Sequence, residues 1–348
     1  MRGDSIMRMH AETSPVVHIP LYSADDTDDS AVRYMVQMLL ACLGSYFAHG
    51  NTYDVLVTTN DYRIVEVLIA YQAKTRYPFH LRLVSRDELR EAFHTDESRL
   101  SDWTCMRTIF SKFYPIVTRQ CHAILHVDCD TIFLRKVDLS PLFVSAIGLI
   151  DGSQFGCRSF WCPTDSQVDF LGITRPVKPV ATWMNSGVFA VQGLGLDICQ
   201  REVRNYLQNL ERAKADYLIH GNSDELIMNA LVLKERKAVT VLSDYGYNFV
   251  AYYLKYDPAW TQHAKIVHFH SLKPDAYWYG NGVVQHRCDE TQAQRLSDDF
   301  YLAVLMWFRH LHTACNALRF EFPIRSLIPL EVVEKELAKM MAQKVALR

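Results

Sequence analysis

The stretch Ile124-Leu-His-Val-Asp128-Cys-Asp130-Thr-Ile-Phe-Leu134 places two carboxylates, one residue apart, between two apolar runs. Flanks rich in Ile, Leu, Val and Phe are typical of buried β-strands. A buried strand does not end in two unpaired charges, because burying a charge without a partner is costly. A hard divalent cation with oxygen ligands is a suitable partner. The stretch therefore predicts a buried strand with a metal site at its carboxyl end, and metals in α/β proteins often hold phosphates.

Strand-like and helix-like segments alternate on both sides of this stretch. Alternation of this kind predicts an α/β fold with a mixed, mostly parallel sheet that is flanked by helices on both faces. A capping-box pair, Ser85 and Glu88, marks the start of one further helix. The predicted strands are 16–22, 54–59, 79–84, 123–127, 187–191, 239–242 and 265–270, and the other predicted helices are 30–49, 61–76, 103–119, 197–213, 223–233, 296–311 and 331–348.

Composition places the chain among ordinary globular proteins. It has 348 residues, of which 49% are hydrophobic and 22% charged, with a formal net charge of -2. This charge argues against a nucleic-acid partner, since such domains carry a basic excess. The 9 cysteines are an odd number without Cys-x-x-Cys spacing, which favours reduced thiols and a cytoplasmic location. The sequence predicts no particular oligomeric state.

Both ends of the chain differ from the middle. Residues 1–15 are polar, lack the apolar core of a signal peptide and are predicted to be a flexible tail. No apolar stretch approaches the roughly 20 residues that a transmembrane helix needs. Residues 331–348 have an amphipathic helical pattern, for which we favour packing on the domain over the alternative of peripheral contact with a membrane surface. Residues 151–182 are rich in Gly and Pro and predict a long functional loop.

Several acidic residues follow the ends of predicted strands. Asp25 and Asp26 follow the first strand, as Asp128 and Asp130 follow the fourth. Ligands of open α/β sheets bind beyond the carboxyl ends of the strands. We therefore expect these carboxylates to meet at one edge of the sheet, where the ligand would lie.

Four further segments accompany the Asp pair. They are Arg107-Thr-Ile-Phe-Ser-Lys112-Phe-Tyr, Met184-Asn185-Ser186-Gly187-Val-Phe, Asn222-Ser-Asp224-Glu225-Leu-Ile-Met-Asn229 and Val267-His268-Phe-His270-Ser-Leu-Lys273-Pro274. In this order the segments resemble the GT-A nucleotide-sugar glycosyltransferases, most closely the retaining family 8 group of glycogenin and the bacterial lipopolysaccharide galactosyltransferases. The resemblance covers roughly residues 16–280. It implies a Rossmann-like GT-A domain over 16–285, followed by a helical segment over 286–348 that packs on the domain or extends it.

The resemblance implies a metal site. Asp128 and Asp130 would coordinate Mn²⁺ or Mg²⁺ on the diphosphate of a nucleotide sugar, with His268 as the third protein ligand. A nitrogen ligand beside two carboxylates suits Mn²⁺ better than Ca²⁺. His270 is a competing ligand, although two residues further along a strand it would point to the opposite face.

The same resemblance implies the site of the donor. Ala24 and Asp25 would lie near the nucleobase, which is expected to be uracil. Lys273 would contact the diphosphate, and Lys112 would lie near the donor phosphates or sugar. The acceptor would be a hydroxyl of a glycan, or of a lipid-linked or protein acceptor.

The catalytic residues implied by the resemblance are Asn185, which would face the donor sugar, with Asp224 and Glu225. Asp224 would bind sugar hydroxyls. Glu225 stands where the group commonly has Gln, and a carboxylate there would be a nucleophile, a base or a hydroxyl ligand. The resemblance implies retention of configuration, and Glu225 leaves the inverting outcome open as an alternative.

Simpler interpretations compete with these roles. Asp224 and Glu225 fall in a predicted first helical turn, where acidic residues are favoured in any case. His126 is predicted to be a structural residue. Two other functions are alternatives. The first is that of a catalytically inactive sugar-nucleotide-binding protein. The second is that of a haloacid-dehalogenase-type phosphatase, whose Asp-x-Asp motif requires Thr at the position where this chain has Ile132.

Overall fold

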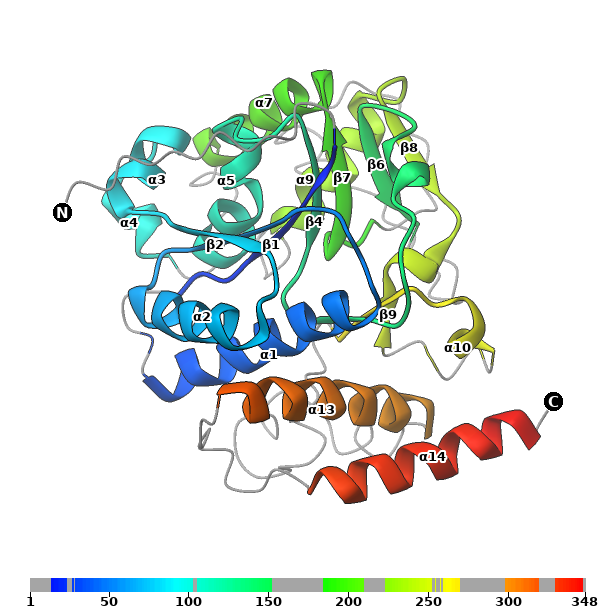
Figure 1. Cartoon of the computed structure of the whole chain (residues 1–348). Coiled ribbons are helices and arrows are strands. Elements are labelled where there is room, and N and C mark those ends of the chain that lie inside the picture. The colour runs from blue at the N-terminus through cyan, green and yellow to red at the C-terminus, as the bar shows by residue number, and fades with distance from the viewer. Residues whose placement is uncertain are drawn as a thin grey trace, which may run out of the picture.

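The structure is a computed structural model of the whole chain (Figure 1). It describes residues 14–23, 27, 29–102, 105–151, 184–209, 223–251, 254, 257, 259–269, 298–318 and 329–346. Nearly all of the predicted tail and of the predicted loop at 151–182 lie outside these ranges.

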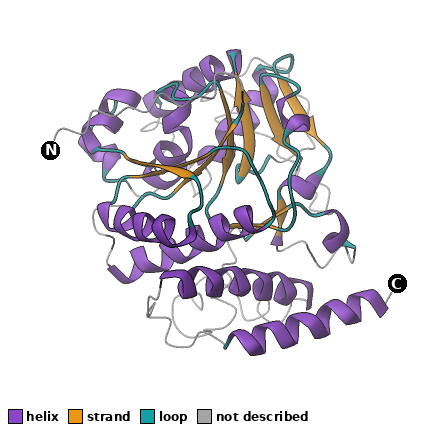
Figure 2. Ribbon diagram, in the orientation of Figure 1, coloured by secondary structure: helices purple, strands orange, loops and turns teal. Residues whose placement is uncertain are grey.

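A seven-stranded sheet forms the centre of the fold (Figure 2). Six of its strands run in one direction, and only β7 is antiparallel to its two neighbours, β4 and β6. The predicted α/β fold with a mostly parallel sheet is therefore confirmed. In order across the sheet the strands are β3 (Phe79–Leu83), β2 (Val55–Thr59), β1 (Val16–Pro20), β4 (Ala123–Val127), β7 (Val188–Gln192), β6 (Ile147–Ile150) and β8 (Val239–Leu242).

A second, three-stranded sheet lies beyond the carboxyl end of β4. Its order is β5 (Thr131–Phe133), β10 (Ile266–His268) and β9 (Phe249–Val250). β5 is antiparallel to β10, and His268 is paired with Thr131. The sequence did not predict β5, because the apolar run after Asp130 is too short to be separated from the strand before it.

Helices cover both faces of the central sheet, as predicted. One hydrophobic core packs under α1 (Asp29–Ala48), α2 (Tyr62–Thr75), α13 (Asp298–Leu318) and α14 (Leu330–Ala346). The other core packs under α3 (Arg86–Phe93), α5 (Ser111–Val117), α7 (Leu194–Gln208) and α9 (Ser223–Lys234). The remaining short helices of the described residues are α4 (Glu97–Leu100), η1 (Cys105–Phe110), η2 (Ser140–Phe143), η4 (Tyr245–Tyr247) and α10 (Trp260–His263).

Local signals account for several helix ends. Asp61 caps α2 by accepting a hydrogen bond from the Arg63 N–H, and Ser85 and Glu88 form the predicted capping box of α3. The predicted helix 103–119 is helical over 105–117, although its first part, η1, is a π-helix and not an α-helix. Pro115 lies inside α5 and has no N–H to donate to the preceding turn, so regular α-helical pairing is interrupted here.

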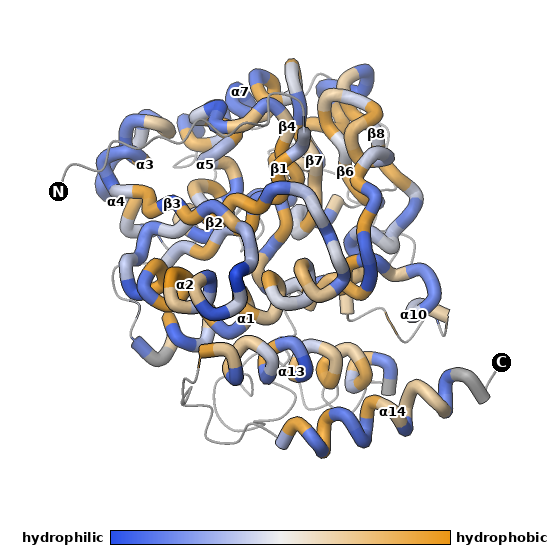
Figure 3. Tube along the Cα trace, viewed as in Figure 1, coloured by the Kyte–Doolittle hydropathy of each residue, from blue (hydrophilic) through white to orange (hydrophobic). Residues whose placement is uncertain are grey.

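Among the described residues, one helix is long and apolar enough to cross a membrane by length and composition, whereas the sequence was expected to contain no such segment. This helix is Ala31–Ala48 in α1, and 72% of that window is buried inside the protein. α13 packs against α1 and α14 packs against α13 (Figure 1). Apolar residues gather along the central strands, whereas α14 alternates between polar and apolar residues (Figure 3).

Candidate metal centre and active site

The reversed direction of β7 determines where the site forms. Because β7 is antiparallel to β4, the start of β7 lies beside the end of β4. The backbone N–H of Asp128 donates to the carbonyl of Gly187 at 2.8 Å. The Asn-Ser-Gly segment before β7 is thereby placed directly beside the Asp pair.

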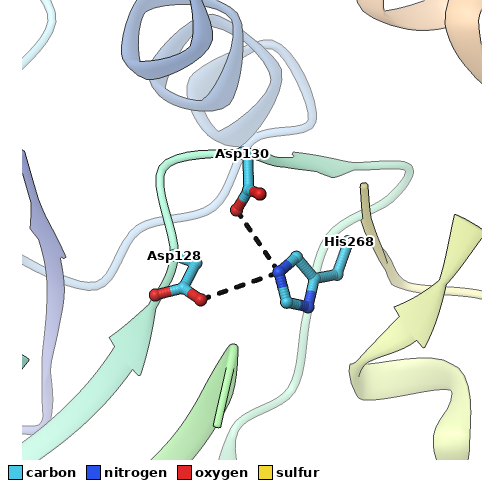
Figure 4. Close-up of side chains that lie close together, drawn as sticks. All are labelled: Asp128, Asp130 and His268. Atoms are coloured by element: carbon cyan, nitrogen blue, oxygen red, sulfur yellow. Dashed lines mark ion pairs between the residues drawn. The ribbon is translucent and has the colours of Figure 1, made fainter. Parts of the chain in front are cut away.

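Asp128, Asp130 and His268 meet at this edge (Figure 4). One candidate ligand atom from each lies within 4.8 Å of the other two. His268 Nε2 is 3.3 Å from Asp130 Oδ1 and 3.6 Å from Asp128 Oδ2. The β5–β10 pairing brings His268 here, and the Phe269 N–H donates to the Asp130 carbonyl at 3.0 Å.

The hydrogen bonds of His268 Nδ1 determine which nitrogen of the ring carries the proton. Its Nδ1 lies 3.1 Å from Asn185 Oδ1 and 3.2 Å from Asn248 Oδ1. Amide oxygens only accept hydrogen bonds, so Nδ1 carries the proton and Nε2 carries the lone pair. Burial lowers the pKa of His268 to about 4, which keeps the ring neutral near pH 7.

Asn185 has several partners in addition to His268. Its Oδ1 accepts from the Gly187 N–H at 2.9 Å and from Asn248 Nδ2 at 2.9 Å. Its Nδ2 donates to Glu225 Oε1 at 2.9 Å. The side chain is buried and positions His268.

Residue 187 must be a glycine, because the His268 ring lies very close to its Cα. A Cβ at this position would lie 2.2 Å from Cε1 and 2.3 Å from Nδ1 of His268. The glycine of the Asn-Ser-Gly segment therefore makes room for the His268 ring.

Lys112 lies at the centre of the charged cluster. Its Nζ is 2.9 Å from Asp128 Oδ2 and 2.5 Å from Asp224 Oδ2, and it donates to Ser186 Oγ at 3.1 Å. Burial opposes the charged form of Lys112, but Asp128 and Asp224 raise its pKa above the ordinary value. Lys112 is thus a buried ammonium that is shared between two carboxylates.

The carboxyl groups near Lys112 differ in their protonation states. Burial opposes ionisation of Asp128, but Lys112 and His126 hold its pKa well below the ordinary value. Burial and the neighbouring Asp224 raise the pKa of Glu225 to about 8, so its carboxyl is mainly protonated at pH 7.

The donor set fits a divalent cation. Asp128 and Asp130 offer carboxylate oxygens, and His268 offers a neutral imidazole nitrogen. The cluster contains Asp128, Asp130 and Asp224 together with Lys112, so its formal net charge is −2, which a divalent cation would neutralise.

Three residues at the site were not predicted from the sequence. Ser186 donates to Asp224 Oδ2 at 2.5 Å, and its position between Asn185 and Gly187 could have indicated it. Asn248 lies in no motif and no signal marks it. His126 Nε2 lies 2.9 Å from Asp128 Oδ1, and strand alternation places it on the same face as Asp128.

Other predicted site residues fall outside the described part of the chain. They are Ala24, Asp25, His270 and Lys273. The chain entering Ala24 is held by two hydrogen bonds between Ser23 and Asn60, each at 2.8 Å, which join the ends of β1 and β2.

No family model matches the sequence, and no curated protein matches it. Three similar solved structures are glycosyltransferases. Mouse xyloside xylosyltransferase 1 in its apo form is 14% identical, with a TM-score of 0.47 over 74% of this chain and 98% of that chain. The galactosyltransferase LgtC, solved with donor and acceptor sugar analogues, is 14% identical, with a TM-score of 0.44 over 82% of this chain and 95% of that chain.

The third structure is the glycosyltransferase GlyE of Streptococcus pneumoniae TIGR4. It is 15% identical, with a TM-score of 0.44 over 85% of this chain and 63% of that chain. At these identities and TM-scores the similarity assigns neither a family nor an activity to this chain.

Proposed function

We propose that the protein is a metal-dependent glycosyltransferase that moves a sugar from a nucleotide sugar, a UDP-sugar, to a hydroxyl acceptor. The observation that carries the proposal is the convergence of Asp128, Asp130 and His268 at the carboxyl end of β4, with Lys112 and Asp224 beside them. Four motifs that are separate in the sequence supply these residues in the order of the GT-A glycosyltransferases.

Asp128, Asp130 and His268 would hold the cation, with Mn²⁺ or Mg²⁺ as the candidates. A bound divalent cation supplies charge stabilisation to a departing diphosphate without any proton transfer. Asn185 and Asn248 keep the His268 Nε2 lone pair facing the carboxylates. Their amides therefore maintain the form of the histidine that can act as a ligand.

Lys112 adds a fixed positive charge to the same side of the site. Glycosyl transfer breaks the bond between the anomeric carbon and the diphosphate, and the electron pair leaves with the diphosphate. A preorganised ammonium stabilises such charge without reorganisation during the reaction. On the resemblance of motifs we also assign Lys273 to the diphosphate and Ala24 and Asp25 to the nucleobase.

Asp224 and Glu225 are proposed to act on the sugar. Asp224 would accept hydrogen bonds from sugar hydroxyls. A carboxyl with a pKa of about 8 is a weak nucleophile at pH 7, because it is mainly protonated. Glu225 is therefore proposed to serve as a hydrogen-bond donor rather than as an anionic nucleophile, which favours retention without a covalent intermediate.

The test is sugar transfer from a panel of UDP-sugars by the purified protein, with Mn²⁺ and with a chelator, in the wild type and in Asp130→Ala. Asp138→Ala is the matched control, because Asp138 is an exposed aspartate further along the chain that caps Ser140. We expect metal-dependent turnover that Asp130→Ala abolishes and Asp138→Ala retains.

Unchanged metal-dependent turnover in Asp130→Ala would contradict the proposed metal site. Binding of UDP by the wild type without hydrolysis or transfer from any sugar nucleotide would instead favour a binding protein without turnover.

A further inference from the structure

Behind Asp128 lies a row of buried polar side chains that the proposed chemistry does not use. Thr58, His18 and His126 are all 0% exposed, and they come from the adjacent parallel strands β2, β1 and β4. His18 is paired with His126, and Thr58 is paired with Pro20, two residues beyond His18. Strand alternation therefore places the three side chains on one face of the sheet, together with Asp128.

Each side chain of the row lies within hydrogen-bond distance of the next. Thr58 Oγ1 is 2.8 Å from His18 Nε2, and His18 Nδ1 is 3.5 Å from His126 Nδ1. His126 Nε2 is 2.9 Å from Asp128 Oδ1. Each nitrogen of the two rings therefore faces one polar partner, and the row ends on a residue of the proposed metal site.

The direction of every hydrogen bond follows from Asp128. A carboxylate oxygen accepts hydrogen bonds, so His126 Nε2, which lies 2.9 Å from Asp128 Oδ1, donates. Neutral His126 then has its lone pair on Nδ1, which accepts from the Nδ1–H of His18. His18 Nε2 in turn accepts from the Thr58 hydroxyl. All donors and acceptors of the row match in this one arrangement.

The surroundings of the row are apolar. The His126 ring stacks on Phe189, with the ring centroids 4.7 Å apart. Polar side chains without partners are costly in such a core, and an aliphatic side chain would fill the same space without that cost. The row therefore has a use beyond filling the core, and its only charged end is Asp128.

We propose that Thr58, His18 and His126 form a positioning row that holds Asp128 Oδ1, so that Oδ2 remains directed at the cation site. The inference rests on the proposed metal-dependent function. His126 is a positioning residue, because its contact is with the ligand residue and not with the cation. Both oxygens of the Asp128 carboxylate have a partner: His126 contacts Oδ1, and Lys112 contacts Oδ2.

The first test is the tautomeric state of the two histidines in the metal-free protein, by ¹⁵N NMR of the histidine rings. The row requires opposite tautomers, with the proton of His18 on Nδ1 and that of His126 on Nε2. If both rings had the same tautomer, the proposed hydrogen-bonded row would be refuted, independently of whether the protein binds a metal.

The second test is the affinity for Mn²⁺ alone, measured by electron paramagnetic resonance. Removing a partner that orients a metal ligand typically lowers metal affinity by about 10–100-fold, which is the expectation for His126→Phe. His126→Gln keeps a side-chain N–H donor and is expected to recover most of that loss. His310→Phe is the matched control, a half-buried histidine on α13, and should leave Mn²⁺ affinity unchanged.

A milder variant covers the case in which His126→Phe does not fold. Thr58→Val removes only the hydrogen bond at the far end of the row, and we expect Mn²⁺ binding that is about 2–10-fold weaker. Wild-type Mn²⁺ affinity in both His126→Phe and Thr58→Val, with only thermal stability lowered, would overturn the positioning role.

Asp128→Asn separates failure of the row from failure of the metal site. If the wild type binds Mn²⁺, Asp128→Asn does not and His126→Phe binds as the wild type does, only the row is wrong. If the wild type itself binds no Mn²⁺, the proposed metal-dependent function is wrong and the positioning role is overturned with it.

Discussion

Lys112→Met removes the only ammonium that the structure places among the described carboxylates of the site. Methionine has a similar length and keeps the packing of the aliphatic stem, so the change is mainly one of charge. Asp128 and Asp224 would then face each other without the cation that Nζ provides. The side chains of Lys112 and Asp224 are each 7% exposed and that of Asp128 is 21% exposed, so water compensates little.

The expected loss of stability is large. Removing one partner of a buried ion pair costs about 3–5 kcal/mol, because it leaves an uncompensated buried charge. At roughly 2–4 °C per kcal/mol for a domain of this size class, the Tm should fall by roughly 6–20 °C. Mn²⁺ should reverse part of the fall, since a cation bound by Asp128 and Asp130 would replace the lost positive charge.

The assay is thermal unfolding with and without Mn²⁺ for the wild type, Lys112→Met and Lys234→Met. Lys234 is the matched control, because its Nζ lies 2.6 Å from Glu202 Oε2 in a mostly buried pair between α9 and α7. Both variants should lose stability, but only Lys112→Met should gain more from Mn²⁺ than the wild type gains. If the Tm of Lys112→Met equals that of the wild type, or if Mn²⁺ stabilises both variants equally, the argument from charge compensation fails.

Two further predictions concern residues around the cluster. The pKa of Glu225 is raised from 4.5 to about 8, so the native state binds the extra proton between these values and stability should fall as pH rises through about 8. Glu225→Gln should remove on the order of 3–5 kcal/mol of this pH dependence, measured by urea unfolding from pH 5 to 9, whereas Glu202→Gln should retain it. Gly187→Ala should weaken Mn²⁺ binding and cost about 1–3 kcal/mol of stability, because its Cβ would overlap the His268 ring. Gly44→Ala, whose Cβ would lie 3.3 Å from the Tyr71 hydroxyl, should leave Mn²⁺ binding unchanged, and an equal loss in both would contradict the close-approach argument.

Local patterns in the sequence were sufficient for most of the elements. The predicted helix 61–76 is α2 with its caps, because Asp61 accepts from the Arg63 N–H and Arg76 adopts the left-handed conformation at the other end, with φ 58°. The strand before Asp128 was predictable for a similar reason, since its apolar residues and the charged pair that ends it are neighbours in the chain. Such signals act over a few residues and do not depend on the rest of the fold.

The polar support of the site could be predicted only in part. His126 was interpreted as structural, although alternation along β4 places it on the face of Asp128, two residues away. Asn248 lies 63 residues from Asn185, and only the pairing of β9 with β10 brings it to His268. Contacts of this kind depend on long-range strand pairing, for which a single sequence carries no local signal.

The orientation of β7 is the feature on which the site depends most and which the sequence did not indicate. The segment Asn185–Gly187 precedes its strand, whereas the Asp pair follows its own. In a purely parallel sheet the two segments would lie at opposite edges, separated by the length of a five-residue strand, roughly 15 Å. Because β7 is reversed, Val188 is paired with Val127, and Asn185 reaches His268 while Ser186 reaches Lys112. The motif order could therefore suggest the chemistry, but only the reversal of one strand in the sheet accounts for how these residues form a single site.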